Sequence, residues 1–252
     1  AAQLAKLRET GNTSFGVLLS DNASNIEGLT AANTAVATAI TITGTTTAAQ
    51  YQAIVDDGGT SISYSISDNY TDLTTAIASD KDANDDLPAF INATEITMTG
   101  NVNLTEFDEI YAALGSFSGT FNYNISADVA ALDTRATTDT NNALANASAV
   151  AITSTDGTAT DVDTYTDINT AASNATATVD TITDSASDLI TSGATAIANA
   201  SAIAIESSAA ITVANYNDIN ALNTGGATFS FTITDDASGL TTADDGTDPS
   251  AA

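Results

Sequence analysis

Large apolar residues in this chain are sparse but regularly spaced, and a first motif of such residues recurs four times. Each copy has an apolar-x-apolar pair, a turn, and then an aromatic residue with Ile three positions later. A period of two predicts a strand with one buried face, and the i, i+3 pair predicts one face of a short helix. Gly44 and Gly100 are expected to end the first two strands. The copies are Ile40, Ile42, Tyr51, Ile54; Ile96, Met98, Phe107, Ile110; Val150, Ile152, Tyr165, Ile168; and Ile203, Ile205, Tyr216, Ile219.

A second motif alternates with the first. It is another strand with alternating apolar residues, followed by Ser or Thr, usually Asp, and an aliphatic residue seven positions after the last strand residue. SYSISDNYTDL and FSFTITDDASGL are its clearest copies, with Asp68 before Leu73 and Asp235 before Leu240. The same offset recurs at three other places in the chain: Leu19 with Ile26, Ile125 with Leu132, and Ile182 with Leu189.

Together the motifs predict an α/β repeat, a parallel β-solenoid-like stack of alternating short strands and short helices. The strands are too far apart in sequence for hairpins and suit crossover connections between parallel strands. An all-β sandwich with antiparallel repeats is the alternative. We expect one repeat domain over 1–252, with a partial repeat at 1–39, repeats at 40–93, 94–148 and 149–201, and a degenerate last repeat at 202–252. The expected inward side chains are Ile42, Tyr51, Ile66, Leu73, Met98, Phe107, Ile152, Ile205, Tyr216 and Ile233.

The strand positions between the apolar residues predict an exposed face rich in hydroxyl groups. Thr and Ser fit an exposed pleated surface, and Thr favours strands because it is β-branched. The alternation breaks near Val179, so we expect a bulge or a poorer strand there. The hydroxyl-bearing positions in the first three strands of the two motifs are Thr41, Thr43, Ser61, Ser63, Ser65, Ser67, Thr97 and Thr99.

Composition excludes several classes of function. The 252 residues include no Cys, His or Trp, which excludes disulfides, zinc sites built on Cys or His, Cys nucleophiles and Ser-His-Asp triads. There are 32 acidic and 4 basic residues, a formal net charge of −28, so nucleic acid and anionic membrane surfaces are not expected partners. No apolar run is long enough to span a membrane. We expect no enzymatic activity and a saline, extracellular or cell-surface location.

The candidate sites in the sequence are aspartates that follow the second strand of the repeat: Asp68, Asp184 and Asp235. One interpretation makes them calcium ligands at a repeated strand end. The other makes them N-caps or turn residues of the helix that follows, which the frequency of Asp at such positions favours. The acidic calcium-loop pattern is missing. We therefore expect no cofactor, with calcium as the one ion left open.

Nine Asn-x-Ser/Thr sequences also occur, only slightly more than so much Asn, Ser and Thr produces by chance. Glycans on the surface, whether on Asn or on the hydroxyl groups, therefore stay open. The sequons begin at Asn12, Asn22, Asn69, Asn92, Asn103, Asn124, Asn146, Asn174 and Asn199.

The alternation of EITMTG, TEFDEI and FSFTITDDASGL resembles the Thr/Asp/Ala-rich strand–helix repeats of very long bacterial secreted and cell-surface proteins, notably cyanobacterial and marine ones. The resemblance extends from about Leu19 to Leu240 and implies an extracellular structural or adhesive role. The first hypothesis is a subunit of a filament, tube, sheath or surface layer. The alternative is a stalk segment of a large adhesin whose binding module lies elsewhere.

The two ends of the sequence suggest that copies of the chain assemble head to tail. Solenoid ends without polar capping repeats leave apolar surface and strand edges open to another copy. Opposite charge at the two ends favours the same contact, while a pair of cut points in a longer polypeptide is the alternative. The residues expected at this contact are Leu4, Lys6, Leu7 and Arg8 at one end and Asp244, Asp245 and Asp248 at the other.

Overall fold

The computed structural model describes residues 17–29, 34, 37–57, 62–80, 90, 93–115, 117–154, 158–206, 210–236 and 240, in which strands and helices alternate. The strands are β1 Val17–Asp21, β2 Ala37–Thr46, β3 Ile62–Asn69, β4 Glu95–Val102, β5 Thr120–Asp128, β6 Ala149–Thr153, β7 Ala177–Asp184, β8 Ala200–Ile205 and β9 Thr228–Ser230. The helices are α2 Ala23–Glu27, α4 Ala48–Asp56, α5 Tyr70–Asp80, α7 Leu104–Leu114, α8 Val129–Thr138, α9 Val162–Ala171, α10 Ala186–Ser192, α11 Ala194–Ala198 and α12 Val213–Leu222.

The nine strands lie in the sheet in their sequence order, from β1 to β9. Pairing is parallel from β1 to β4 and from β5 to β9. This confirms the predicted α/β arrangement of parallel strands alternating with helices, and the antiparallel alternative is wrong. The chain forms two compact units, and the boundary between Tyr123 and Asn124 falls inside β5.

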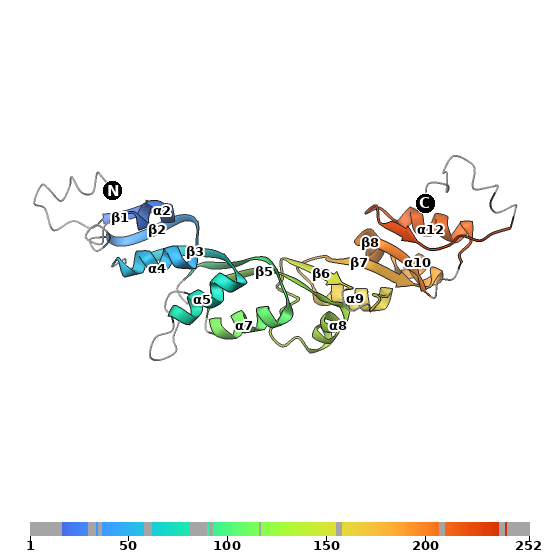
Figure 1. Cartoon of the computed structure of the whole chain (residues 1–252), viewed down its shortest axis with the longest axis horizontal. Coiled ribbons are helices and arrows are strands. Elements are labelled where there is room, and N and C mark those ends of the chain that lie inside the picture. The colour runs from blue at the N-terminus through green and yellow to red at the C-terminus, as the bar shows by residue number, and fades with distance from the viewer. Residues whose placement is uncertain are drawn as a thin grey trace, which may run out of the picture. The chain divides into compact units, whose positions relative to one another are not determined.

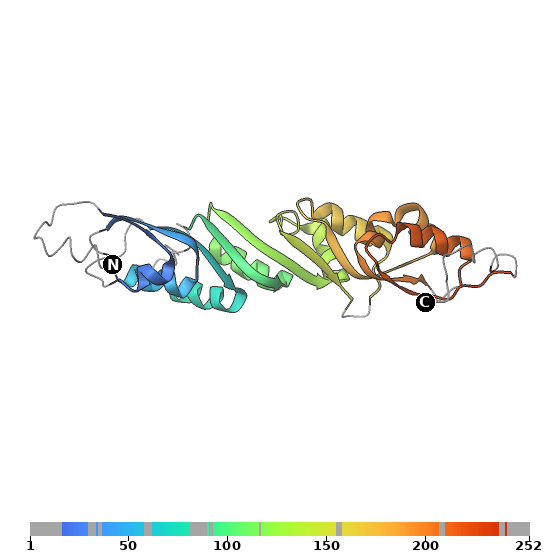
Figure 2. The same cartoon turned by 90° about the horizontal axis from the view of Figure 1, so that it is seen from above.

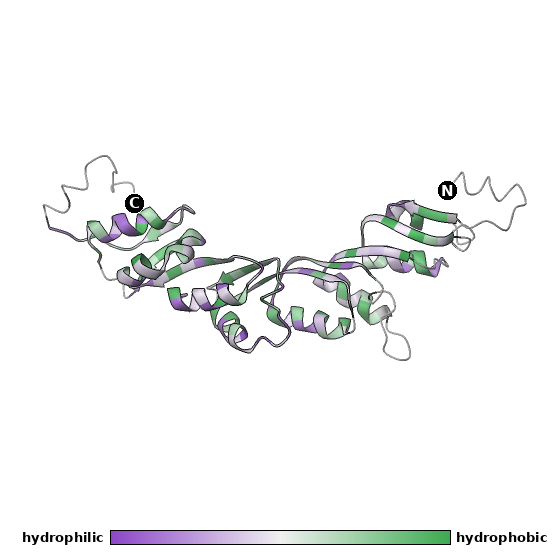
Figure 3. Cartoon of the chain, turned by 180° about the vertical axis from the view of Figure 1, so that it is seen from behind, coloured by the Kyte–Doolittle hydropathy of each residue, from purple (hydrophilic) through white to green (hydrophobic). Residues whose placement is uncertain are grey.

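Within each unit, the helices pack side by side over one face of the strands (Figures 1 and 2). In the first unit α2, α4, α5 and α7 contact one another in order, and in the second α8, α9, α10 and α12 do. One strand face is therefore covered and the other is not. Hydrophobic and hydrophilic segments consequently alternate along the ribbons in Figure 3. In the described part of the chain, no helix has the length and apolar character needed to cross a membrane.

The predicted inward set forms most of the core. Eight of its ten members are buried: Ile42, Tyr51, Ile66, Leu73, Met98, Phe107, Ile152 and Ile205. Tyr216 and Ile233 are only half-buried, because they pack around β9, the last strand of the sheet. That strand is also shorter than the alternation from Phe229 to Ile233 predicts, since Ile233 keeps only an isolated bridge to Ile211.

The helix aromatics of the first motif pack on the strand that follows. The rings of Tyr51 in α4 and Tyr64 in β3 stack with centroids 4.0 Å apart. Phe107 in α7 lies 4.6 Å from Tyr123 in β5, centroid to centroid. Tyr165 follows the same rule with a polar contact, since its buried hydroxyl donates to the carbonyl of Ala177 at the start of β7, at 2.8 Å. In these three crossovers, one aromatic side chain of the helix therefore packs against the next strand.

Gly44 and Gly100 do not end their strands, so that expectation is wrong. β2 continues to Thr46 and β4 to Val102, and both of these last side chains are buried. The two glycines have φ of +77° and +81°, and in β2 the register with β3 shifts around Gly44. A glycine in this region makes a bulge, which turns the end of the strand back toward the core.

Replacing Gly100 with alanine is expected to lower the free energy of unfolding by about 1–2 kcal/mol, because a Cβ is strained at positive φ. Nothing lies within 4 Å of the added Cβ, so steric overlap plays no part. Urea denaturation of the variant measures the loss. Gly28→Ala is the matched control, since Gly28 has φ of −71° and should change stability little. Equal losses in both variants would contradict the strain argument.

The uncovered strand face carries the predicted hydroxyl groups where the structure describes it. Thr41, Thr43, Ser63 and Thr99 are exposed, and Thr97, Ser65 and Ser67 are half-buried, while Ser61 lies outside the described residues. The break predicted near Val179 is present. Buried side chains in β7 fall at Ala177, Val179 and Ile182, and β8 also has a three-residue interval, from Ala200 to Ile203.

Candidate functional site

Asp68 and Asp184 lie at the ends of β3 and β7, and Asp235 lies beyond β9, two residues after the isolated bridge of Ile233. One carboxylate oxygen of each accepts a hydrogen bond from the backbone amide of the next residue. The distances are 3.1 Å for Asn69 N to Asp68 Oδ1, 2.7 Å for Ser185 N to Asp184 Oδ1 and 2.8 Å for Asp236 N to Asp235 Oδ1. This local bond fixes the side chain at the strand end, so its other oxygen points in a defined direction.

That other oxygen reaches the first amide of the helix that precedes the strand. Asp184 Oδ2 accepts from Val162 N of α9 at 3.0 Å, and Asp235 Oδ2 from Val213 N of α12 at 3.0 Å. Asp68 Oδ2 accepts from Ala48 N of α4 at a longer 3.4 Å. The partners lie 22, 22 and 20 residues back in the sequence, respectively. The same contact therefore joins strand to helix in three copies of the second motif.

For Asp184, the interpretation as the N-cap of the following helix is wrong. The N-cap of α10 is Ser185, whose hydroxyl accepts from Asp188 N at 3.1 Å. The preceding helices also have their own N-cap side chains, Thr47, Asp161 and Thr212, which accept from the third helical amide. The strand-end aspartate adds the first amide, so two of the four otherwise unpaired amides of each helix have side-chain acceptors.

These contacts bear on the cation hypothesis. Each carboxylate already accepts two backbone amides, which are the donors that a metal ion would have to displace or share. Among the described residues, no group of three or more Asp, Glu, Cys or His side chains is arranged to hold a metal ion. Burial raises the pKa of Asp68 above its ordinary value, and the hydrogen bonds from Asn69 and Ala48 oppose that rise. The sites therefore stand as strand-to-helix contacts.

Two clefts lie beside these contacts, at matching places in the repeat. The first, of about 580 Å³, lies between α4 and α5 and includes Asp68 and Asp72. The second, of about 300 Å³, includes Asp184 and Asp188 of β7 and α10. We call them the α4–α5 cleft and the acidic cleft. Sequence reasoning found the aspartates but not the clefts, because the helix that forms the far wall comes from the preceding crossover.

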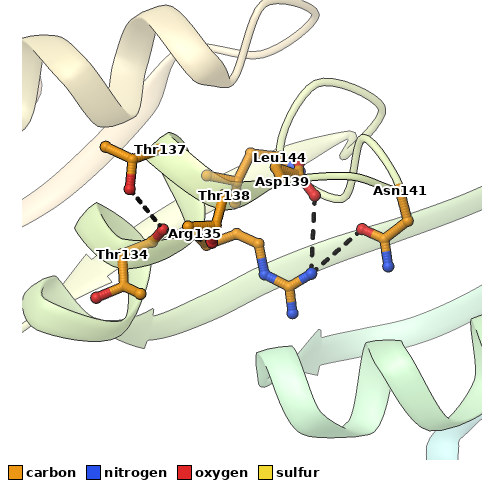
Figure 4. A network of polar contacts seen from close by, with 7 residues as sticks. All are labelled: Thr134, Arg135, Thr137, Thr138, Asp139, Asn141 and Leu144. Carbon is orange, nitrogen blue, oxygen red and sulfur yellow. Dashed lines mark hydrogen bonds and ion pairs between the residues drawn. The ribbon is translucent and has the colours of Figure 1, made fainter.

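Arg135 is the basic residue in the described part of the chain, and it is engaged in a local network (Figure 4). Its Nη1 donates to Asn141 Oδ1 at 3.2 Å and lies 3.7 Å from Asp139 Oδ1. Asp139 Oδ2 in turn accepts from the amide of Leu144, a fully buried residue. Arg135 therefore holds the connection between α8 and β6, and its place in the last turn of α8 also suits the helix dipole.

The Asn residues of several sequons have a structural role as helix N-caps. Asn22 and Asn103 are N-caps of α2 and α7, and their side chains accept from the amides of Asn25 and Glu106. Asn69 does the same for Asp72 N at 3.0 Å. Asn is a favoured N-cap, and Ser and Thr are common throughout this chain, so capping alone generates Asn-x-Ser/Thr at these strand ends.

Chelation and salt are expected to act differently on the folded chain. Because the aspartates are occupied by amides, EDTA at 1 M NaCl should leave the melting temperature unchanged. Lowering NaCl to about 10 mM should reduce the melting temperature by roughly 5 °C or more. The Debye length then grows from about 3 Å to about 30 Å, so salt screens the repulsion within the −28 net charge less. Circular dichroism measures both. Unfolding by EDTA at high sodium would show that calcium is structural.

The pKa of Asp68 gives a pH dependence with a defined sign. A carboxyl group whose pKa is raised on folding binds more protons in the native state, so its contribution to stability is present at low pH and lost as pH rises through the folded pKa. We expect the stability of the wild type relative to Asp68→Asn to fall as pH rises from about 3.5, near the ordinary carboxyl pKa. Urea denaturation at successive pH values tests this. A difference that grows with pH would contradict it.

The residues predicted for head-to-tail contact lie outside the described residues. They are Leu4, Lys6, Leu7, Arg8, Asp244, Asp245 and Asp248. Comparison with known proteins adds no assignment, since no family model, curated protein or solved structure matches the chain.

Proposed function

We propose that this chain is a non-enzymatic structural repeat segment of an extracellular assembly such as a filament, tube, sheath or surface layer. The observation that carries the proposal is the repeated contact from a strand-end aspartate to the preceding helix, at Asp68, Asp184 and Asp235. The polar side chains that recur with the repeat serve to hold one strand–helix unit to the next. Such a chain stabilises itself through neighbouring units and presents a long regular surface.

Charge supports an exterior location for this segment. A net charge of −28 on 252 residues is tolerated best where abundant cations screen it. The absence of Cys means that stability depends on packing and backbone contacts in any redox environment. Sequential parallel pairing also lets repeats be added without a new kind of contact.

Electron microscopy of the purified full chain tests the proposal. Ordered polymers in saline buffer would support a self-assembling subunit. Monodisperse particles at all salt concentrations, with a single-chain mass by light scattering, would overturn self-assembly and favour the alternative, an adhesin stalk segment. Turnover of a substrate by the purified chain would overturn the non-enzymatic role.

Head-to-tail contact is tested separately by charge reversal. Lys6→Glu with Arg8→Glu removes half of the basic residues, which we propose pair with Asp244, Asp245 and Asp248 of another copy. Polymerisation at low salt should be impaired while the circular dichroism spectrum stays unchanged. If the variant assembles as well as the parent, charge pairing between the ends is not the mechanism.

A further inference from the structure

The α4–α5 cleft is predominantly apolar at its base. Tyr51 of α4, Ile66 of β3 and Phe90 contribute to its lining, and all three are buried residues. Tyr51 is held in place by its stack on Tyr64. Alanines of both helices complete the apolar wall, which leaves about 580 Å³ unfilled. This volume falls in the range of small-molecule sites, roughly 300–1,000 Å³.

Three carboxylates lie on the same lining and accept hydrogen bonds from neutral donors, and two of them, Asp68 and Asp72, also interact with each other. Gln52 Nε2 donates to Asp56 Oδ1 at 2.9 Å, and Asn69 Nδ2 to Asp72 Oδ2 at 2.6 Å. Asp68 accepts backbone amides as described above. Among the described residues, no Lys or Arg contributes to this lining. Neutral donors orient these carboxylates but leave their negative charge uncompensated, so the lining complements a cation.

The acidic cleft and the α4–α5 cleft differ in their lining residues. It occupies the matching place beside Asp184, but its lining includes Asp161, Asp163, Asp188 and Glu206 and no aromatic residue. Such a lining suits hydrated ions. The α4–α5 cleft is larger and combines fewer carboxylates with aromatic and aliphatic side chains. Such side chains give no favourable contact to a hydrated ion, but they bury the apolar part of an organic ligand away from water.

We propose that the α4–α5 cleft is a binding site for a small organic cation, an ammonium group carried on an aromatic or aliphatic body. The apolar body lies against Tyr51, Ile66 and Phe90, and the ammonium group faces Asp68 and Asp72, while Asp56 adds negative charge at the other end of α4. Burial raises the pKa of Asp68, and a bound cation would stabilise the charged form of this carboxyl group. The site is independent of polymerisation, and it goes beyond the proposed structural role.

Benzylammonium is a suitable probe, titrated into the full chain at about 0.15 M NaCl to screen non-specific charge attraction. Isothermal calorimetry should give a saturable site with a dissociation constant on the order of 1 mM or below. Benzyl alcohol, which keeps the ring without the charge, should bind at least about tenfold more weakly, a difference of about 1.4 kcal/mol. Methylammonium, which keeps the charge without the ring, should show no saturation over the same range.

Two sets of variants locate the site. Asp56→Asn with Asp72→Asn should weaken benzylammonium binding by about threefold to tenfold. The matched control, Asp163→Asn with Asp218→Asn, removes the same net charge from exposed positions on α9 and α12 and should leave the affinity unchanged. Ala53→Leu fills the cleft from α4 and should abolish binding of the probe. Ala131→Leu, at an exposed position of α8, is its control.

Three results would overturn the site. They are equal binding of benzyl alcohol and benzylammonium, an equal loss of affinity in the two double variants, or full binding by Ala53→Leu. Unchanged circular dichroism spectra and melting temperatures show which variants are folded. Because Ala53→Leu and the double variant act through volume and charge respectively, misfolding of one leaves the other as a test.

Discussion

Replacing Phe107 with alanine should lower the free energy of unfolding by about 3–5 kcal/mol, the largest effect expected in this chain. Phe107 is fully buried in α7 and lies at the centre of an aromatic cluster. Its ring centroid lies 4.6 Å from that of Tyr123, 5.4 Å from Tyr111 and 6.1 Å from Phe121. Removing the ring leaves a cavity between these neighbours, and the surrounding structure relaxes into such a cavity only in part.

Urea denaturation followed by tyrosine fluorescence measures this loss, because the chain has no Trp. Tyr111→Ala is the matched control on the same helix, since Tyr111 is 45% exposed and should cost less than about 1 kcal/mol. If Phe107→Ala does not fold, Phe107→Leu should still cost about 1–2 kcal/mol. Equal effects of Phe107→Ala and Tyr111→Ala would contradict the view that first-motif aromatics close the crossovers.

The period of the apolar residues was enough to predict most of the fold. Alternation located strands such as the one containing Ile96 and Met98, and the aromatic–aliphatic pair located helices such as the one containing Phe107 and Ile110. Parallel pairing followed from the length of the connections. These features depend on which side chains a strand or helix buries, which is a local property of the sequence.

Features that depend on backbone dihedral angles or distant partners could not be predicted. A glycine after an alternating run can end a strand or make a bulge, and the positive φ of Gly44 with the register shift beside it identifies the bulge. Likewise, Asp184 precedes Ser185 and α10 in the way that a local cap does. Its hydrogen bond to the amide of Val162 joins residues 22 positions apart, and the sequence around Asp184 does not predict this donor.

The constant spacing of these aspartates nevertheless indicates a contact with a distant partner. Asp21, Asp68, Asp184 and Asp235 each stand five positions before an aliphatic residue, whereas the copy in β5 has Ala127 there. A cap for the following helix is needed only within the first turn and could shift by a residue. A contact across a crossover fixes the aspartate relative to the strand, so constant spacing favours the contact that the structure contains.

The second large effect is expected at Asp184. Asp184→Ala should lower the free energy of unfolding by about 2–3 kcal/mol, because it leaves the amides of Val162 and Ser185 without their side-chain acceptor. These amides belong to the start of α9 and to the N-cap of α10, so one substitution weakens two helices. Asp184→Asn keeps one carbonyl oxygen and should lose less than the alanine variant.

Net charge must be separated from this contact, since removing any carboxylate from a chain of −28 relieves repulsion. Asp180→Ala is the matched control, because Asp180 is exposed on the same strand and its removal should change stability by no more than about 0.5 kcal/mol. Hydrogen exchange adds a second measurement. The amide of Val162 should lose protection in Asp184→Ala but not in Asp180→Ala. If Val162 stays protected, its bond to Asp184 does not hold α9 to the end of β7.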